Sequence, residues 1–206
     1  GMAKETAHQI GTPLSSLIGW LEILKMENIE ESTIVEIEKD INRLQTITDR
    51  FSKIGSEPVL EKRDIVEDTH KTIDYLQTRV SQQVSFSFKA PEHPIYVEIN
   101  PALHSWTIEN LVKNAIDAMK GKGSLNIVIS ELEDVVKISI TDTGKGIPKN
   151  QFTKVFEPGF TTKKRGWGLG LSLTKRIVQE YHKGKIKVAH SEIGKGTTMQ
   201  ISYKTA

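Results

Sequence analysis

The sequence has no cysteine among its 206 residues, and aromatic residues make up only 6% of it. The absence of cysteine excludes disulfide frameworks, thiolate metal sites and cysteine nucleophiles. No apolar run approaches the roughly 20 residues that a membrane helix needs, and no signal-peptide pattern opens the chain. We therefore expect a soluble, cytoplasmic fragment without membrane contact, cut from a parent that could be membrane-anchored. Gly1 and Met2 resemble the remnant of a removed tag.

The first 56 residues carry the apolar pattern of helices. Apolar residues recur every three or four positions from Ile10 to Leu24 and again from Ile34 to Ile54. The short polar break at about residues 28–32 predicts an antiparallel α-helical hairpin. The recurring apolar residues form one apolar stripe along each helix. Because a lone hairpin leaves much of each stripe exposed, a second copy is expected to complete a four-helix bundle. This predicts a homodimer through residues 3–55.

The rest of the chain carries the period of strands. Apolar residues alternate with polar ones in six segments, at 84–88, 95–99, 125–129, 136–140, 186–188 and 199–203. Helical patterns lie at 64–80, 101–119 and 169–182. Strands that are apolar on one face, with helices to cover it, predict an α/β two-layer sandwich. The expected domains are residues 1–56 and 57–206, with a linker at 55–58.

Charge differs between the two halves. Residues 1–56 hold six basic and nine acidic side chains, so the net charge of +2 leaves +5 for the remainder. An excess of positive charge favours a polyphosphate ligand, although a charge of this size also fits an ordinary solvated surface.

Glycine is concentrated near the end of the chain, where nine of the 15 fall between Gly144 and Gly196. After Asp142, glycines let the backbone approach a flat ligand, and the carboxylate can accept from an adenine amine. The glycines at 166–170 lead directly into a predicted helix, whose free N–H groups form a natural phosphate site. Each group by itself also fits a tight turn between elements.

The helix predicted at 101–119 has an unusual polar face. Asn110, Asn114 and Asp117 share one side of it, and oxygen ligands so placed suit Mg²⁺, which also binds phosphates. The alternative is a solvated helix face. Two asparagines are poor formers of a helix interior, so they call for some compensation.

Four segments now resemble a known family. In chain order, 110–115, 142–146, 152–163 and 166–171 are similar to the N box, first glycine box, F box and second glycine box of sensor histidine kinases. The resemblance implies the GHKL (Bergerat) ATP-binding fold over residues 57–206, with ATP and Mg²⁺ as cofactors. It also implies a mobile lid from about 151 to 168, in which Trp167 departs from the small polar residues usual in the family.

The resemblance also implies roles for single residues. Asn114 would coordinate Mg²⁺ with support from Asn110, and Asp142 would hold the adenine amine. Lys163 and Arg165 would lie near the phosphates. The implied nucleotide-binding set is Asn110, Lys113, Asn114, Asp117, Asp142, Gly144, Gly146, Ile147, Lys163, Arg165, Gly168, Leu169, Gly170, Leu171 and Thr197.

The segment 7–14 resembles the phospho-acceptor H box, with His8 as the acceptor. Gln9 stands where the family usually has an acidic residue, and because Gln9 cannot act as a base, we expect weakened autophosphorylation. Thr12 resembles the position whose hydroxyl orients water for phosphatase activity. The remaining histidines are expected at the surface: His70, His93, His104, His182 and His190.

Together these features predict an ATP-dependent protein-histidine kinase core that phosphorylates His8 and passes the group to an aspartate of a response regulator. The regulator would dock near Ser15, Ser16, Gly19 and Trp20, and no nucleic acid is expected. Two alternatives stay open. One is a GHKL-type ATPase or serine kinase that uses Glu109 as base; the other is a degenerate kinase that binds nucleotide and signals by conformation.

Overall fold

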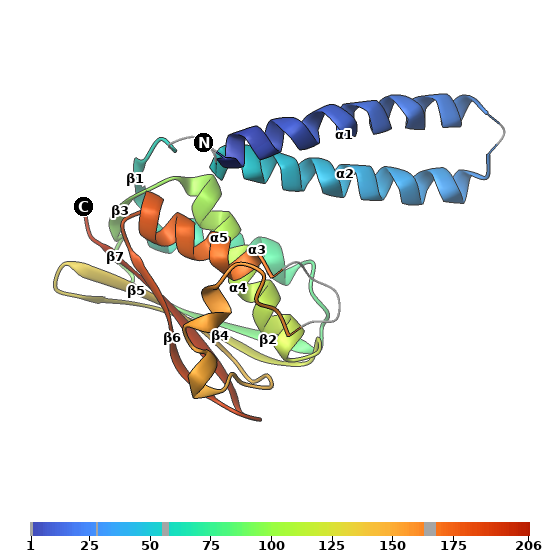
Figure 1. The fold of residues 1–206 in the computed structure, drawn as a ribbon. Coiled ribbons are helices and arrows are strands. Elements are labelled where there is room, and N and C mark those ends of the chain that lie inside the picture. Colours follow the sequence, from blue (N-terminus) through green and yellow to red (C-terminus); the bar gives the residue numbers. More distant parts are fainter. Residues whose placement is uncertain (1, 28, 55–57, 163–167) are drawn as a thin grey trace. The chain divides into compact units, whose positions relative to one another are not determined.

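The computed structural model describes residues 2–27, 29–54, 58–162 and 168–206, with the backbone alone over 2–13 and 43–54. The chain divides into two compact units, residues 1–58 and 59–206 (Figure 1). No helix in the described residues combines the length and apolar character that crossing a membrane requires.

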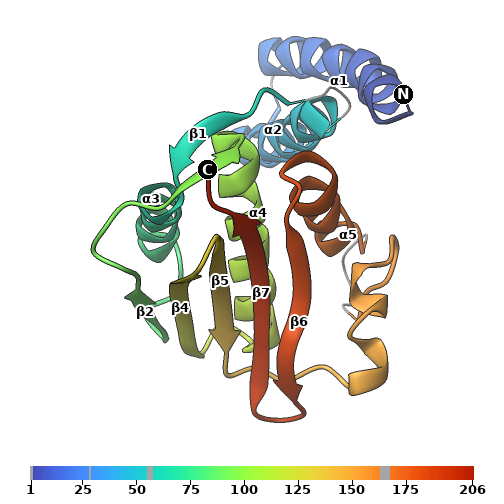
Figure 2. The ribbon, with the colours of Figure 1, turned by 90° about the vertical axis from the view of Figure 1, so that its left-hand side faces the viewer.

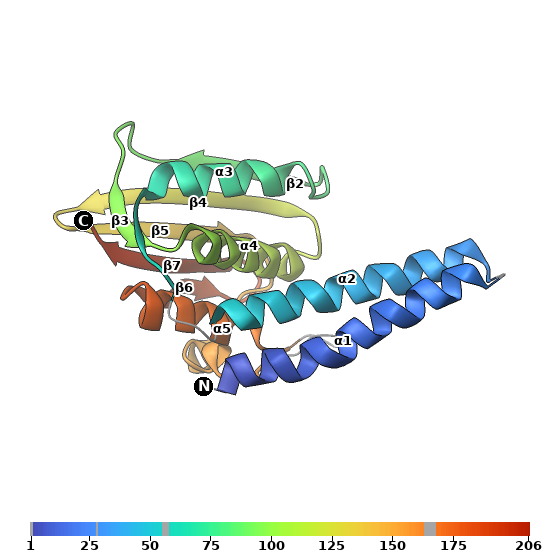
Figure 3. The same cartoon turned by 90° about the horizontal axis from the view of Figure 1, so that it is seen from above.

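The first unit is a pair of antiparallel helices, as predicted. Helix α1 (Met2–Met26) and helix α2 (Glu31–Ile54) lie side by side along their length (Figure 3). Lys25 ties the two together, because its Nζ donates to Glu22 on its own helix (3.0 Å) and to Glu38 on the other (3.1 Å).

The core of this hairpin is small. Among the side chains that the structure describes there, Leu14, Leu21 and Ile41 are buried. Leu17 belongs to the same predicted stripe, yet it is 46% exposed in the single chain. The described part of the hairpin therefore buries only some of the apolar residues that its sequence pattern provides.

The second unit is built on a five-stranded sheet in the order β2-β4-β5-β7-β6. Only β2 and β4 run parallel; the other neighbours are antiparallel. The strands are β2 (Val84–Lys89), β4 (Gly123–Leu132), β5 (Val135–Asp142), β6 (Lys185–Glu192) and β7 (Gly196–Lys204).

Three helices cover one face of this sheet: α3 (Ile65–Gln77), α4 (Pro101–Ala118) and α5 (Gly170–Arg176) (Figure 2). Between the layers lie side chains with no exposed surface, among them Ile108 from α4 and Ile127 and Ile138 from the sheet. The α/β two-layer sandwich expected from the strand and helix periods is thus confirmed.

One strand was not predicted. β1 (Glu61–Asp64) pairs antiparallel with β3 (Tyr96–Ile99) in a separate two-stranded sheet, so the strand expected at 95–99 stands outside the main sheet. The sequence of β1, Glu-Lys-Arg-Asp, is charged throughout and lacks the alternation of apolar and polar residues that marks a half-buried strand. Strand β1 is held instead by its pairing with β3 and by Asp64, whose side chain accepts from Val66 N–H at 3.0 Å.

The helix predicted at 169–182 is not a regular α-helix throughout. The α-helical part ends at Arg176 and continues as a π-helical turn, η3 (Ile177–Tyr181). Two short 3₁₀ turns, η1 (Lys149–Gln151) and η2 (Lys154–Phe156), precede α5 along the chain. Such π turns are rare and are frequently found at functional sites.

The surface positions predicted for His104 and His182 are wrong, because both side chains are buried. His104 lies on the inward face of α4 and its Nε2 is 2.9 Å from the Thr69 hydroxyl. His182 accepts from the Asn100 N–H at 3.1 Å. Burial lowers the pKa of His104 to about 3 and that of His182 to about 4; the proximity of His182 further lowers that of His104. His104 is one helical turn from Ile108, so the apolar period of α4 includes it.

Candidate functional site

Helix α4 is the platform of the candidate site. Asn100 caps its start by accepting from Leu103 N–H at 3.1 Å, and Pro101 occupies its first turn. The helix buries its apolar stripe against the sheet. On the other side, Asn110 and Asn114 are half-buried, while the predicted Lys113 and Asp117 are exposed.

Asp142 closes strand β5 in a buried position, at 5% exposure. Its carboxylate accepts from the backbone N–H groups of Gly144, at 2.8 Å, and Thr197. Burial raises the pKa of this carboxyl above its usual range, and the two hydrogen bonds oppose that rise. A carboxylate held in this way has lone pairs left to accept a further N–H donor.

The glycine turn after β5 rests on the end of α4. Lys145 N–H donates to the carbonyl of Ala118 at 3.1 Å. A side chain at Gly144 would place its Cβ 2.7 Å from the Ala118 carbonyl carbon, so only glycine fits this approach. The contact brings the Asp142 turn to the end of α4 that carries Asn114 and Asp117.

Ser191 on β6 was missed by the sequence analysis. Its hydroxyl accepts from Ile147 N–H at 2.7 Å and lies 2.8 Å from the Thr197 hydroxyl. It thereby joins two predicted nucleotide-binding residues that are 50 positions apart. Nothing in the pattern around Ser191 distinguishes it, because its role depends on β6 and β7 being paired.

Asn110 connects α4 to the second glycine segment. Its Nδ2 donates to the Thr174 hydroxyl on α5 at 2.7 Å, and its Oδ1 lies 2.7 Å from where a Cβ of Gly170 would be. The structure therefore brings Asn110 beside Gly168–Leu171, which are predicted to bind the phosphates. Thr174 is a second contact residue that the sequence analysis did not single out.

Within the F box, Gly159 N–H donates at 3.0 Å to the carbonyl of Gly168, which lies just before α5. Lys145 Nζ donates to the Thr162 hydroxyl at 2.8 Å, which links the first glycine turn to the F box. The predicted residues Lys163 and Arg165, together with Trp167, lie outside the described residues.

In the hairpin, the predicted phospho-acceptor His8 and its neighbours Gln9 and Thr12 belong to helix α1. His8 and Thr12 are four residues apart, which is about one turn of an α-helix. Their side chains lie outside the described residues.

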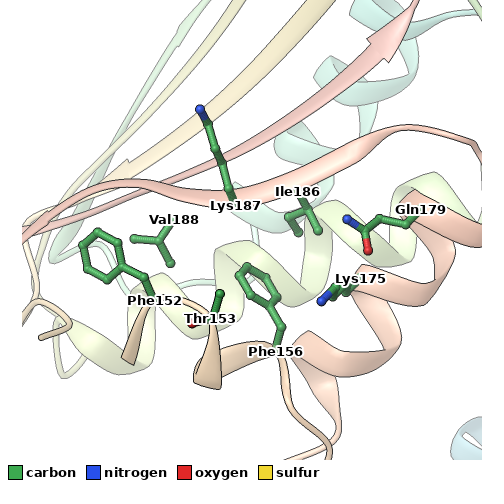
Figure 4. A pocket seen from close by; sticks show the side chains of 8 residues that line it. All are labelled: Phe152, Thr153, Phe156, Lys175, Gln179, Ile186, Lys187 and Val188. Carbon is green, nitrogen blue, oxygen red and sulfur yellow. The ribbon is translucent and has the colours of Figure 1, made fainter. Parts of the chain in front are cut away.

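A pocket of about 260 Å³ lies between strand β6, the 3₁₀ turns η1 and η2, and helix α5 with its π-helical end η3 (Figure 4). None of the predicted site residues that the structure describes lines it. Phe156 lies in it with its ring 5.9 Å from Lys175 Nζ. Its lining is Phe152, Thr153, Phe156, Lys175, Gln179, Ile186, Lys187 and Val188. Phe152 and Phe156 of the F box therefore pack beside the edge strand β6.

Known proteins share both units. The family model described as His Kinase A (phospho-acceptor) domain matches residues 1–57. The model described as histidine kinase-, DNA gyrase B-, and HSP90-like ATPase matches residues 103–206. Sporulation kinase E of Bacillus subtilis is 32% identical over 211 residues, which cover 98% of this chain and 28% of that protein. The chain thus spans less than a third of the length of that relative.

Solved structures agree with these matches. The catalytic domain of histidine kinase ThkA is similar with a TM-score of 0.64 and 26% identity, over 70% of this chain and 95% of that one. ThkA in complex with the response regulator protein TrrA matches 100% of this chain and 61% of that one, with a TM-score of 0.68. At 24% identity, this second likeness shows the fold. With both domains matched in this order, the chain belongs to the sensor histidine kinases, which join a phospho-acceptor hairpin to an ATPase domain of the kind found in DNA gyrase B and HSP90.

Proposed function

We propose that this chain is an ATP-dependent protein-histidine kinase core. Residues 57–206 bind ATP, the γ-phosphoryl group passes to His8 in the domain of residues 1–56, and an aspartate of a response regulator receives it. One observation carries the proposal: the carboxamide-bearing helix α4 touches both glycine segments, through Asn110 with α5 and through Ala118 with the Asp142 turn. A related structure, ThkA with TrrA, supports a response regulator as the partner.

The adenine end of the nucleotide belongs at Asp142. Its buried carboxylate has acceptor capacity for the exocyclic amine of adenine. Gly144, Gly146 and Thr197 would shape the pocket for the base, with Ile147 beside them. The hydrogen bonds of Ser191 to Ile147 and to Thr197 keep these neighbours in place.

The residues on α4 fit Mg²⁺. Asn110 and Asn114 offer carboxamide oxygens, which suit this cation, and Gly170 has no side chain to cover Oδ1 of Asn110. A Cβ at Gly170 would fill the space beside that oxygen. When bound, Mg²⁺ supplies neutralisation of the charge on the β- and γ-phosphates.

In the transfer step, a ring nitrogen of His8 forms a bond to the γ-phosphorus while the bond from that phosphorus to the bridging oxygen breaks, and ADP leaves. The imidazole proton passes to solvent, since Gln9 cannot accept it. Autophosphorylation is therefore slower than with a carboxylate at this position. The Thr12 hydroxyl would orient water against the phosphorylated regulator, which gives the chain a phosphatase activity as well.

We also infer that the chain acts as a homodimer through residues 3–55. The exposure of Leu17, between the buried Leu14 and Leu21, supports a second copy that covers the hairpin. Trp20, at 61% exposure, offers the aromatic surface expected where a regulator docks beside the acceptor helix.

The test is incubation with γ-labelled ATP and Mg²⁺ of the wild type, His8→Ala, Asn114→Ala and the exposed control His190→Ala. Protein label that survives alkali but not acid is expected in the wild type and H190A and is lost in the other two. Label that persists in H8A would favour the serine kinase, and released phosphate without protein label would favour the ATPase. Nucleotide binding with neither product would favour the degenerate kinase.

A further inference from the structure

The hydroxyl of Thr174 lies buried between α4 and the start of α5. The residue is 1% exposed. Its Oγ1 makes two hydrogen bonds, one with Nδ2 of Asn110 at 2.7 Å and one with the carbonyl of Gly170 at 2.9 Å. Thr174 thus contacts Asn110 on α4 and Gly170 at the start of α5.

The chemistry of these groups fixes the direction of both bonds. A carbonyl oxygen can only accept, so the single hydroxyl proton of Thr174 goes to Gly170. The Thr174 oxygen then has only lone pairs to offer, and Asn110 must turn its NH₂ group toward it. The carboxamide oxygen of Asn110 is left on the other side, where it can face a ligand.

Close packing keeps the carboxamide in this orientation. A Cβ at Gly170 would lie 2.7 Å from Oδ1 and 3.0 Å from Nδ2 of Asn110, so the amide lies directly on the Gly170 backbone. Rotation of the amide by half a turn would set its oxygen against the Thr174 oxygen. Because both oxygens would then be acceptors, the flipped form loses the 2.7 Å hydrogen bond and sets two acceptors against each other beside the buried Thr174.

We propose that Thr174 is a positioning residue of the nucleotide site: its hydroxyl, held by the Gly170 carbonyl, orients Asn110 so that the carboxamide oxygen is presented to the Mg²⁺ that would bind with the phosphates. The inference rests on the proposed function, because the orientation matters only if Mg²⁺ and ATP bind beside Asn110. What the site needs from Thr174 is its hydroxyl and not its volume. Valine has nearly the same shape and would fill the position without orienting the amide.

The chain offers a matched control. Thr107 lies on α4, the helix of Asn110; it is fully buried, and within the described part of the chain its hydroxyl has no hydrogen-bond partner. Thr107→Val therefore removes a buried hydroxyl from the same layer without removing a hydrogen bond to Asn110. Thr174→Ser keeps the hydroxyl and serves as the conservative variant.

The experiment measures the affinity of the non-hydrolysable analogue AMPPNP by calorimetry, in Mg²⁺ and in EDTA, for the full chain. Mg²⁺ is expected to increase the AMPPNP affinity of the wild type by a certain factor, and we expect this factor to be about tenfold smaller in Thr174→Val. The AMPPNP affinity of the variant in EDTA should stay within about twofold of the wild type. T174S and T107V should behave as the wild type does. In a double-mutant cycle, Thr174→Val should add little to Asn110→Ala.

Thermal melts without nucleotide accompany each variant, and Thr174→Ala replaces T174V if the valine variant is not folded at the assay temperature. The proposal is overturned if the hydroxyl-less variants keep the full effect of Mg²⁺, or if they lose affinity equally in Mg²⁺ and in EDTA. If the wild type itself does not bind AMPPNP, the proposed function fails and this inference fails with it. Wild-type binding with an unchanged T174V overturns the positioning role alone.

Discussion

The two units of this chain carry equally clear apolar patterns but bury them to different extents. In the α/β unit, a continuous core runs along all five strands of the main sheet and includes Ile127, Ile138 and Ile201 with no exposed surface. In the hairpin, three of the described side chains are buried, and Leu17 on the same stripe is half exposed. The α/β unit completes its core by itself, whereas the described part of the hairpin leaves apolar side chains exposed, as expected if the proposed second copy covers them.

The largest effect is expected from a charge placed in the small core of the hairpin. Leu21→Asp puts a carboxylate at a position that is 3% exposed, so the hairpin and its dimer should be lost. AMPPNP binding by the α/β unit should stay as in the wild type. Light scattering and circular dichroism measure the first effect and calorimetry the second. The control is Met26→Asp, at a position 88% exposed; a dimer that survives L21D would contradict the comparison.

A cavity in the larger core should destabilise the α/β unit. Ile138→Ala, at a fully buried position, is expected to lower the free energy of unfolding of the α/β unit by about 2–5 kcal/mol. Denaturant titration measures the loss. Ile193→Ala, at a position 63% exposed, should stay within about 0.5 kcal/mol of the wild type. Similar losses in the two variants would show that burial in this unit does not decide its stability.

The buried histidines make the stability of the α/β unit depend on pH. In the folded state the pKa of His104 is about 3 and that of His182 about 4, while an unfolded histidine titrates near 6.5. Between about pH 4 and 6.5 the unfolded state therefore binds more protons. The stability is fully present above pH 6.5 and declines as the pH falls, by about 1.4 kcal/mol per pH unit for each histidine.

Removal of one of these histidines tests this dependence of the unfolding free energy on pH. His182→Gln keeps an acceptor for Asn100 N–H. Between pH 4.5 and 6 it should reduce the slope of the unfolding free energy against pH by about 1.4 kcal/mol per pH unit. Denaturant titrations at several pH values measure it. The exposed His190→Ala should leave the slope unchanged, and an unaltered slope in H182Q would assign the dependence to other groups.

The smallest effect is expected from the ion pairs of the hairpin surface. Lys25 bridges Glu22 and Glu38, and these hydrogen bonds raise its pKa. Because the lysine is solvated, Lys25→Gln should lower the melting temperature of the hairpin only slightly at low salt and not at all at high salt. A large loss that persists in high salt would show that the hairpin depends on this pair more than on its apolar core.

The long periodic segments of the sequence predicted most of the fold. The two stripes of the hairpin and the alternating segments of β4, β5 and β7 specify their elements locally, through periods of 3.6 and 2. The charged strand β1 carries no such period, and it forms because β3 lies beside it. The π-helical turn at Ile177–Tyr181 likewise has no local signature.

For the site, the sequence determined which chemical groups are present and in what order: the carboxamides of Asn110 and Asn114, the carboxylate of Asp142 and the glycines near them. Only the tertiary structure decided which groups meet. Ser191 holds Ile147, and Thr174 orients Asn110, across separations of 44 and 64 residues. Contacts of this kind leave no local period, because they arise only when strands pair and helices pack. The burial of His104 and His182 was decided in the same way, by the layer that covers them.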